Sequence, residues 1–221
     1  MQLRGMSLSP YYERVVIVLD VKNALDRVEH GRMPGVFGSP ELKAENPTGK
    51  IPYLILDDGS ILPEGQVIAE YLNAVFEGET LMPEDPLATA RVRVFGRLVD
   101  LYLGQHTMPL ARTVTRGTYD DAALALALET GIPDALDHIE FHLSGGPYAV
   151  GDSFTMADAA LIPFMFHLTS FLAHFELKPF EGRPKLEAWW NAHKDTPLVE
   201  RCFGRMQKSL DFVLSLRAAA K

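Results

Sequence analysis

Ser9, the two tyrosines that follow it and a pair of spaced histidines have the types and spacing to carry chemistry in this chain. Ser9 stands directly before Pro10, and serine followed by proline is a strong signal for the N-cap and first position of a helix. No histidine lies near Ser9 in the sequence to act as its base, although a histidine close in space stays open. We therefore expect Ser9 to be a hydrogen-bond donor rather than a covalent nucleophile.

The histidines are His138 and His142, four residues apart, which is the spacing of two zinc ligands on one helix. The glutamate between them has the wrong spacing for zinc chemistry and no third ligand is evident, so we expect no metal site. Cys202 is the single cysteine, which excludes an internal disulfide, a cysteine-rich metal site and a two-thiol redox pair. We expect it to be a small buried residue in a reducing, cytoplasmic protein.

The composition is that of a packed protein with one or two domains. The chain has 221 residues, of which 47% are hydrophobic and 23% charged. Its net charge of −8 disfavours a nucleic-acid binder that works by neutralising phosphates. No apolar run reaches the ~18 residues that a membrane-spanning helix needs, and residues 1–5 show no secretory signal. We therefore expect no nucleic acid and no membrane as partners.

The elements that must position these residues fall into two groups. The first 78 residues mix strand and helix patterns: strands over 2–8, 26–30, 51–56 and 61–62, and helices over 10–25, over 40–45 and from 63–65 to 76. A hairpin signal at 57–60 joins the last two strands. This order is the α/β thioredoxin-like arrangement βαβαββα.

The rest of the chain reads as helical. A polar stretch over 77–86 predicts a linker, and helices are expected over 86–112, over 122–143, after residue 155, over 185–194 and over 197–218. Thr155 and Asp158 have the spacing of a capping box, a structural rather than a catalytic feature. Pro163 should kink the helix that this box begins, or mark a tight junction.

Five motifs in register make the chain resemble the soluble glutathione transferases over essentially its whole length. They are Ser9-Pro10-Tyr11, the segments 46–52, 57–72 and 151–158, and the segment from Pro184 to Trp189. The arrangement is most similar to the serine- or cysteine-type classes common in bacteria and plants. The resemblance implies a thioredoxin-like glutathione-binding domain over 1–78, then an all-α helical domain over 86–221 that contributes the acceptor-substrate site.

The resemblance also implies which residues bind glutathione. Pro52 would follow a cis bond, so that the backbone of Ile51 pairs with the cysteinyl part of the tripeptide as one strand pairs with another. Glu64 would face the ammonium of the γ-glutamyl end, while Gly65 lies at a helix N-terminus that faces its carboxylate. Lys50 would reach the glycyl carboxylate, or would be an ordinary exposed loop lysine.

Position 65 departs from the family, which usually has serine there. Loss of that hydroxyl bond to a charged group costs about 10–150-fold in affinity unless another donor replaces it. Gln66 or a water is a candidate replacement, and the Gly65 N–H remains. The sequence therefore predicts either weaker glutathione binding or a substitute contact.

Ser9 matches the position of the family's catalytic serine or cysteine. A thiol with a pKa near ~8.5 is mostly protonated at neutral pH. A hydroxyl donor at a helix N-terminus favours the thiolate. Tyr11 and Tyr12 are near enough in sequence to replace Ser9 as this donor or to line the acceptor pocket, and Ser7 is a weaker substitute. Serine rather than cysteine at position 9 argues against the mixed-disulfide chemistry of the family's glutaredoxin-like members.

The resemblance places an acceptor site between the two domains. Tyr102, His106 and Leu110 follow one another at i, i+4 and i+8 on the long helix of the second half, and are either acceptor-site residues or ordinary core. The family is usually dimeric, so we expect a homodimer. Arg91, Arg93 and Arg97 would pair with acids across its interface, or belong to a solvated face.

The function implied is that of a transferase: glutathione, as substrate or co-substrate, is activated for attack on an electrophilic, apolar small molecule, as in detoxification. Two alternatives stay open. One is a non-catalytic binding or scaffold protein with a decayed thiol site, which Gly65 favours. The other is an isomerase that uses glutathione without consuming it.

Overall fold

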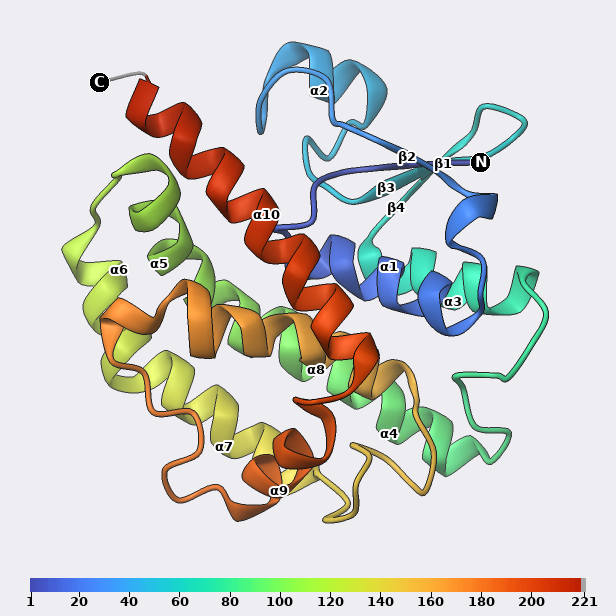
Figure 1. The fold of residues 1–221 in the computed structure, drawn as a ribbon, viewed down its shortest axis with the longest axis vertical. Coiled ribbons are helices and arrows are strands. Elements are labelled where there is room, and N and C mark those ends of the chain that lie inside the picture. Colours follow the sequence, from blue (N-terminus) through green and yellow to red (C-terminus); the bar gives the residue numbers. More distant parts are fainter. Residues whose placement is uncertain (220–221) are drawn as a thin grey trace. The chain divides into compact units, whose positions relative to one another are not determined.

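A four-stranded sheet organises the N-terminal part of the chain in the computed structural model, which describes residues 1–219 (Figure 1). The strands are β1 (Gln2–Arg4), β2 (Glu29–Gly31), β3 (Tyr53–Ile55) and β4 (Ile61–Pro63), in the spatial order β2-β1-β3-β4. β1 pairs in parallel with β2 and antiparallel with β3, and β3 pairs antiparallel with β4. The thioredoxin-like order βαβαββα predicted from the sequence is confirmed.

Three helices accompany this sheet: α1 (Pro10–Val21), α2 (Pro40–Glu45) and α3 (Gly65–Val75). Two of them begin at a serine followed by proline. The Ser9 hydroxyl oxygen accepts the Tyr12 N–H at 3.4 Å, and the Ser39 hydroxyl oxygen accepts the Leu42 N–H at 3.3 Å. α1 and α3 lie side by side on one face of the sheet (Figure 1). Together these elements form a compact first unit, Met1–Leu81.

Several expected boundaries in this unit are wrong. The strand expected over 2–8 ends at Arg4, and the strand expected over 51–56 covers Tyr53–Ile55. α1 ends at Val21 rather than near residue 25, because Asn23 takes a left-handed conformation with φ +52° that stops the helix. The strand expected over 26–30 starts at Glu29, and Leu25–Arg27 forms a short 3₁₀ helix instead. The polar residues of β2 show no alternation, so the strand is defined by its pairing with β1 rather than by its own pattern.

The second unit begins at Met82 and is helical. Its helices are α4 (Pro86–Arg97), α5 (Gly104–Arg116), α6 (Asp121–Leu126), α7 (Ile132–His142), α8 (Met156–Phe166), α9 (Pro184–His193) and α10 (Pro197–Ala219). The expected helices over 86–112 and 122–143 each contain a π-helical segment, at Leu98–Leu103 and Ala127–Gly131. The first of them also continues beyond residue 112, to a left-handed Gly117 with φ +67°.

α8 forms the core of the second unit. Every residue from Met156 to Phe166 is buried, as expected for a helix that is apolar on all sides. The predicted capping box is present at its start. Pro163 lies inside the helix, which continues into a third π segment, His167–Phe171. Cys202 is buried, as expected, and is not part of a disulfide; its Sγ lies 3.8 Å from the Met206 sulfur.

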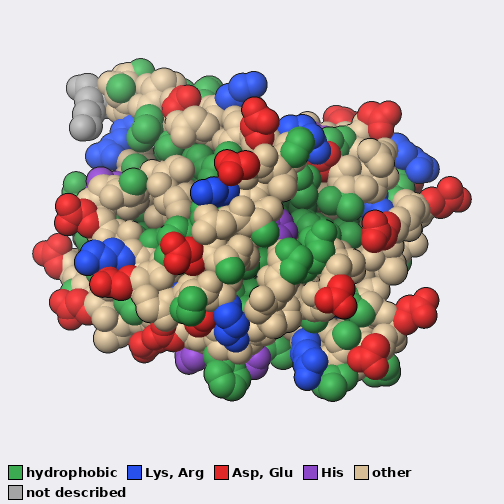
Figure 2. Space-filling view, turned by 60° about the horizontal axis from the view of Figure 1, so that its bottom comes forward, with side chains coloured by type: hydrophobic (Ala, Val, Ile, Leu, Met, Phe, Trp, Pro, Cys, Tyr) green, Lys and Arg blue, Asp and Glu red, His purple; other side chains and the backbone are tan. Residues whose placement is uncertain are grey.

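Two surface properties bear on partners. Within residues 1–219, no helix is long and apolar enough to cross a membrane. On the face drawn in Figure 2, Lys and Arg side chains lie singly among Asp and Glu, with no continuous basic area. That pattern agrees with the net charge of −8.

Candidate functional site

Three segments that are far apart in the sequence meet around Gly65 in the first unit. A Cβ atom built on Gly65 would lie 2.7 Å from the carbonyl oxygen of Tyr11 and 3.4 Å from Cγ of Pro52. The first turn of α1, the loop before β3 and the first residue of α3 therefore share one corner of the unit. These are the segments that carry the predicted catalytic and glutathione-binding residues.

Ser9 lies half-buried at the N-terminus of α1, with extended backbone angles that are typical of an N-cap. Its oxygen accepts the long bond from the Tyr12 N–H, and its hydroxyl hydrogen is donated to no acceptor among residues 1–219. The hydroxyl is thus able to cap α1 and to donate to an outside group at the same time. The two roles predicted for Ser9 are compatible with one geometry.

A buried asparagine shapes the loop that leads to the predicted backbone contact. The Asn46 amide donates to the Thr48 hydroxyl and to the Lys50 carbonyl, each at 2.9 Å. The Ile51-Pro52 bond is cis, as the sequence resemblance implied. No hydrogen bond within residues 1–219 uses the amide or carbonyl of Ile51, so both stay available to pair with another backbone.

The Lys50 side chain is exposed and forms no ion pair with the described residues. An exposed ammonium next to an unpaired backbone segment is suited to meet a carboxylate from solution. The contact of Lys50 with a glycyl carboxylate stays a prediction, as does its alternative of an ordinary loop lysine.

Glu64 is the N-cap residue of α3 and has an unusual backbone, with φ +73° and ψ 114°. A residue held in such a sparsely populated region costs about 1–3 kcal/mol, and strain of this kind clusters at binding and catalytic sites. The Glu64 carboxylate does not cap its own helix, and it is exposed. The unusual backbone of Glu64 is therefore not explained by a capping bond from its own side chain. It places an acidic side chain beside the N–H groups at the start of α3, which have no partner within the helix.

The predicted substitute for a hydroxyl at position 65 is committed elsewhere. The Gln66 side-chain oxygen accepts from the Arg14 guanidinium at 3.2 Å, and its NH₂ group donates to Glu70 at 3.1 Å. Arg14 is fully buried on α1, and its guanidinium lies 5.9 Å from the centre of the Tyr11 ring. Gln66 thus ties α1 to α3 inside the unit, and only its backbone N–H remains at the helix start.

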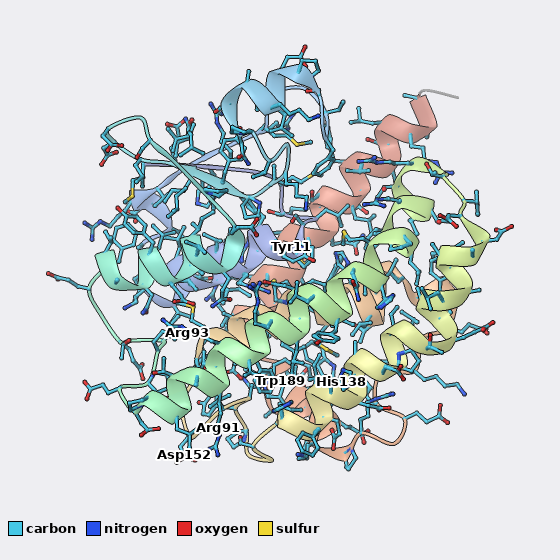
Figure 3. The ribbon with its side chains drawn as sticks, turned by 180° about the vertical axis from the view of Figure 1, so that it is seen from behind. Tyr11, Arg91, Arg93, His138, Asp152 and Trp189 are labelled. Atoms are coloured by element: carbon cyan, nitrogen blue, oxygen red, sulfur yellow. The ribbon has the colours of Figure 1, made fainter. Side chains whose placement is uncertain are left out.

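The two tyrosines after Pro10 have different environments. Tyr12 is buried, its hydroxyl is 2.7 Å from Nδ1 of His30, and its ring packs on Gly5. Tyr11 is half-buried and lies at the N-terminal end of α1 (Figure 3). The assignment of both tyrosines to the acceptor site stays a prediction.

Tyr102, His106 and Leu110, predicted to follow one another along the long helix, differ in burial. Tyr102 is 45% exposed with its ring against His138, at 5.4 Å between centroids, whereas Leu110 is fully buried. His106 packs on Gly131, where a Cβ would come within 2.4 Å of its ring. Tyr102 lies in the π segment Leu98–Leu103, while His106 and Leu110 lie in α5. The acceptor role of these three residues stays a prediction.

The basic residues of α4 are exposed, and Arg91 and Arg93 leave opposite sides of the helix (Figure 3). Positions two apart on an α-helix differ by about 200°. Arg97 lies 3.7 Å from Asp100 on the same helical stretch. The three arginines therefore do not form one continuous face for a partner. Within residues 1–219, no three side chains of the metal-binding types gather as a metal site would need, and His138 and His142 have no third ligand there.

Sequence reasoning missed the Arg14–Gln66–Glu70 network and the role of Asn46. The available signal for the network was Arg14 next to the apolar run 15–19, because an arginine at a core position is almost never fully buried without partners. The tyrosine in β3 is also fully buried. Its burial, together with the charge of Glu45, raises the pKa of Tyr53 to about 12, so its phenol is neutral and is no acid or base for the site.

The fold and this corner define a thioredoxin-like domain followed by a helical domain, and comparison with known proteins identifies the family. The glutathione S-transferase N-terminal domain matches residues 3–80, and the glutathione S-transferase C-terminal domain matches residues 99–197. Glutathione S-transferase 3 of Zea mays is 32% identical over 214 residues, covering 91% of this chain and 92% of the relative. The chain belongs to the glutathione S-transferase family.

Solved structures agree with this assignment. Gtt2 from Saccharomyces cerevisiae superposes with a TM-score of 0.77 at 26% identity, covering 91% of this chain and all of the other. A glutathione S-transferase from Methylobacillus flagellatus, solved with GSH bound, has a TM-score of 0.73 at 27% identity, covering 91% of this chain and 98% of that one.

Proposed function

We propose that this protein binds glutathione at the corner around Gly65 and activates its thiol for attack on an electrophilic, apolar small molecule. The observation that carries the proposal is the convergence of Tyr11, Pro52 and Gly65 within the first unit. It brings the Ser9 hydroxyl, the unpaired Ile51 backbone and the α3 N-terminus together. A relative of similar fold solved with GSH bound supports the same ligand.

Each part of glutathione has a matching group in this arrangement. The backbone of Ile51 pairs with the cysteinyl N–H and C=O, and the Lys50 ammonium meets the glycyl carboxylate. Glu64 binds the γ-glutamyl ammonium, and the N–H groups at the start of α3 bind its carboxylate. The cysteinyl sulfur then lies toward Ser9.

The proposed chemistry depends on the hydroxyl hydrogen of Ser9, which is donated to no acceptor among residues 1–219. Donation from its hydroxyl stabilises the thiolate over the thiol, and the N-terminus of α1 adds a partial positive charge. The thiol proton passes to solvent water. The resulting thiolate is the nucleophile, and it attacks an electrophilic carbon while the leaving group departs with its electron pair. Ser9 keeps its own proton throughout, so no base is required to activate the serine.

One experiment separates this proposal from its alternatives. The purified protein is applied to immobilised glutathione, and glutathione consumption is followed with an aromatic halide as the test electrophile. Retention with one glutathione consumed per product supports the transferase. A cis-configured activated alkene is offered as a second substrate, and its conversion to the trans isomer without glutathione consumption supports an isomerase. Retention without activity on either substrate supports a binding protein. Failure to be retained and failure to react refute the glutathione site.

Two further features belong to the proposal on family grounds. We place the protein in the cytoplasm, where a lone buried cysteine such as Cys202 stays reduced. We also expect a homodimer, as is usual in the family, with detoxification of apolar electrophiles as the broad role.

Glu64 offers a test in which stability and binding move in opposite directions. Glu64→Gly removes the positive-φ strain and should raise the free energy of unfolding by about 1 kcal/mol. The same change removes the partner of the ammonium and should weaken glutathione binding by about 10–150-fold. Glu64→Gln keeps the strain and should lose affinity with no gain in stability.

Glu176 provides the matched control, because it is an exposed glutamate of positive φ, +54°, in the second unit. Glu176→Gly should gain similar stability and leave the Kd for glutathione unchanged. Urea denaturation and titration calorimetry give both quantities. Equal affinities of Glu64→Gly and wild type would remove Glu64 from the site.

A further inference from the structure

We infer that Gly65 is a positioning residue, which sets the distance between the first turns of α1 and α3 and thereby holds the Ser9 hydroxyl at the bound thiol. This inference rests on the proposed glutathione site. It reverses the sequence-based view of position 65, in which glycine is a loss because the family's serine hydroxyl is missing. In the structure, the absence of a side chain is what lets the two helices approach.

Space, and not backbone conformation, requires glycine at this position. Gly65 is not among the glycines of positive φ, so its backbone would accept any residue. A Cβ would lie 2.7 Å from the Tyr11 carbonyl oxygen, which is closer than real Cβ contacts. That oxygen belongs to the helix backbone and cannot rotate away, so a side chain at 65 must push α1 and α3 apart.

The neighbouring residue links the same two helices. The Arg14 guanidinium on α1 donates to the Gln66 side-chain oxygen on α3 at 3.2 Å. This hydrogen bond and the close approach of Gly65 to the Tyr11 carbonyl therefore connect the same two helices. The carboxylate of glutathione is held by α3 and its cysteinyl backbone by Ile51, whereas the sulfur meets Ser9 on α1. A wider gap therefore leaves the tripeptide on α3 and moves the donor away from the sulfur.

Gly65→Ala and Gly65→Ser distinguish this inference from a missing hydroxyl. If the distance between α1 and α3 determines binding, both variants should bind glutathione about 5-fold or more weakly than wild type. Both also raise the pKa of the bound thiol, read from thiolate absorbance against pH, because the Ser9 donor is farther away. If the missing serine hydroxyl determines binding, Gly65→Ser should bind glutathione more tightly than wild type, and Gly65→Ala should bind it with unchanged affinity. That result overturns the inference.

The melting temperature supplies a reading that does not depend on glutathione. Gly65→Ala should lower the Tm by about 2–12 °C through overpacking. Gly204→Ala is the control, because Gly204 is exposed on α10 with nothing within 4 Å of its Cβ position, and it should not lower the Tm. If wild type does not bind glutathione, the proposed function fails, and the Tm of Gly65→Ala still decides whether position 65 is overpacked.

A second variant covers the case in which no side chain at 65 allows folding. Gln66→Ala removes the bond to Arg14 and keeps the backbone N–H at the start of α3. It should raise the pKa of the bound thiol with a smaller change in Kd. An unchanged thiol pKa in Gln66→Ala, or unchanged binding and Tm in both position-65 variants, overturns the positioning role.

Discussion

Ser9→Ala is expected to lower kcat/KM for glutathione transfer by about 10–150-fold, the value of one hydrogen bond to a charged group. The Kd for glutathione should change little, because in the proposed site the tripeptide is held mainly by Glu64, Ile51 and the N-terminus of α3. The loss should therefore fall on the chemical step. The pKa of the bound thiol should rise toward its value in free glutathione, and the loss should shrink at high pH, where the thiol ionises without help.

Ser39→Ala is the control that separates catalysis from capping. Ser39 is also half-buried, precedes a proline and accepts the N–H three residues on, at 3.3 Å against 3.4 Å for Ser9. Both alanine variants should lose about 1 kcal/mol of stability. Only Ser9→Ala should lose activity. Equal activity in the two would move the donor role to Tyr11, which Tyr11→Phe then tests directly.

The parts of the fold that were predictable from sequence are those with local causes. Ser9-Pro10 and Ser39-Pro40 set two helix starts, because the cap and the first position are adjacent residues. The capping box at Thr155 was readable for the same reason. β2 was placed with less accuracy, because its pairing with β1 is a contact between distant residues and its own sequence lacks alternation.

The candidate site was predictable as a set of residues but not as a geometry. Motif resemblance selected Ser9, Ile51 and Glu64, yet the role of Gly65 depends on a carbonyl oxygen 54 positions earlier in the chain. No local pattern carries that contact. The π segment at Leu98–Leu103 was invisible for a different reason: a periodicity of 3.6 residues per turn predicts one regular helix and gives no signal for a local change of helix type.

The second large effect is expected at Asp158, in the second unit. Its carboxylate is fully buried and accepts four bonds: the Thr155 N–H at 2.9 Å and hydroxyl at 3.1 Å, the Ala149 N–H at 2.8 Å, and the Trp189 indole N–H at 2.8 Å. Figure 3 shows Trp189 in the interior of the unit, on α9. One side chain thus joins the start of α8, the loop before it and α9.

Asp158→Ala should therefore cost about 3–5 kcal/mol of unfolding free energy, because several buried donors each lose ~1–3 kcal/mol when their acceptor is removed. Asp158→Asn should also be strongly destabilised. One carboxylate oxygen accepts from Ala149 and Trp189 and the other accepts both bonds from Thr155, so the NH₂ group of asparagine would replace an acceptor and face two donors. Trp189→Phe removes a single donor and should cost less than either. All three are measured by urea denaturation.

Asp120→Ala supplies the comparison, because Asp120 is an exposed N-cap that accepts one bond, from the Ala123 N–H at 3.0 Å. It should cost about 1 kcal/mol. A cost for Asp158→Asn no greater than that of Asp120→Ala would mean that the carboxylate is a simple cap and not the junction of three segments. The Kd for glutathione should not change in any folded variant, because each of the groups bonded by Asp158 lies in the second unit, while the groups proposed to bind the tripeptide lie in the first.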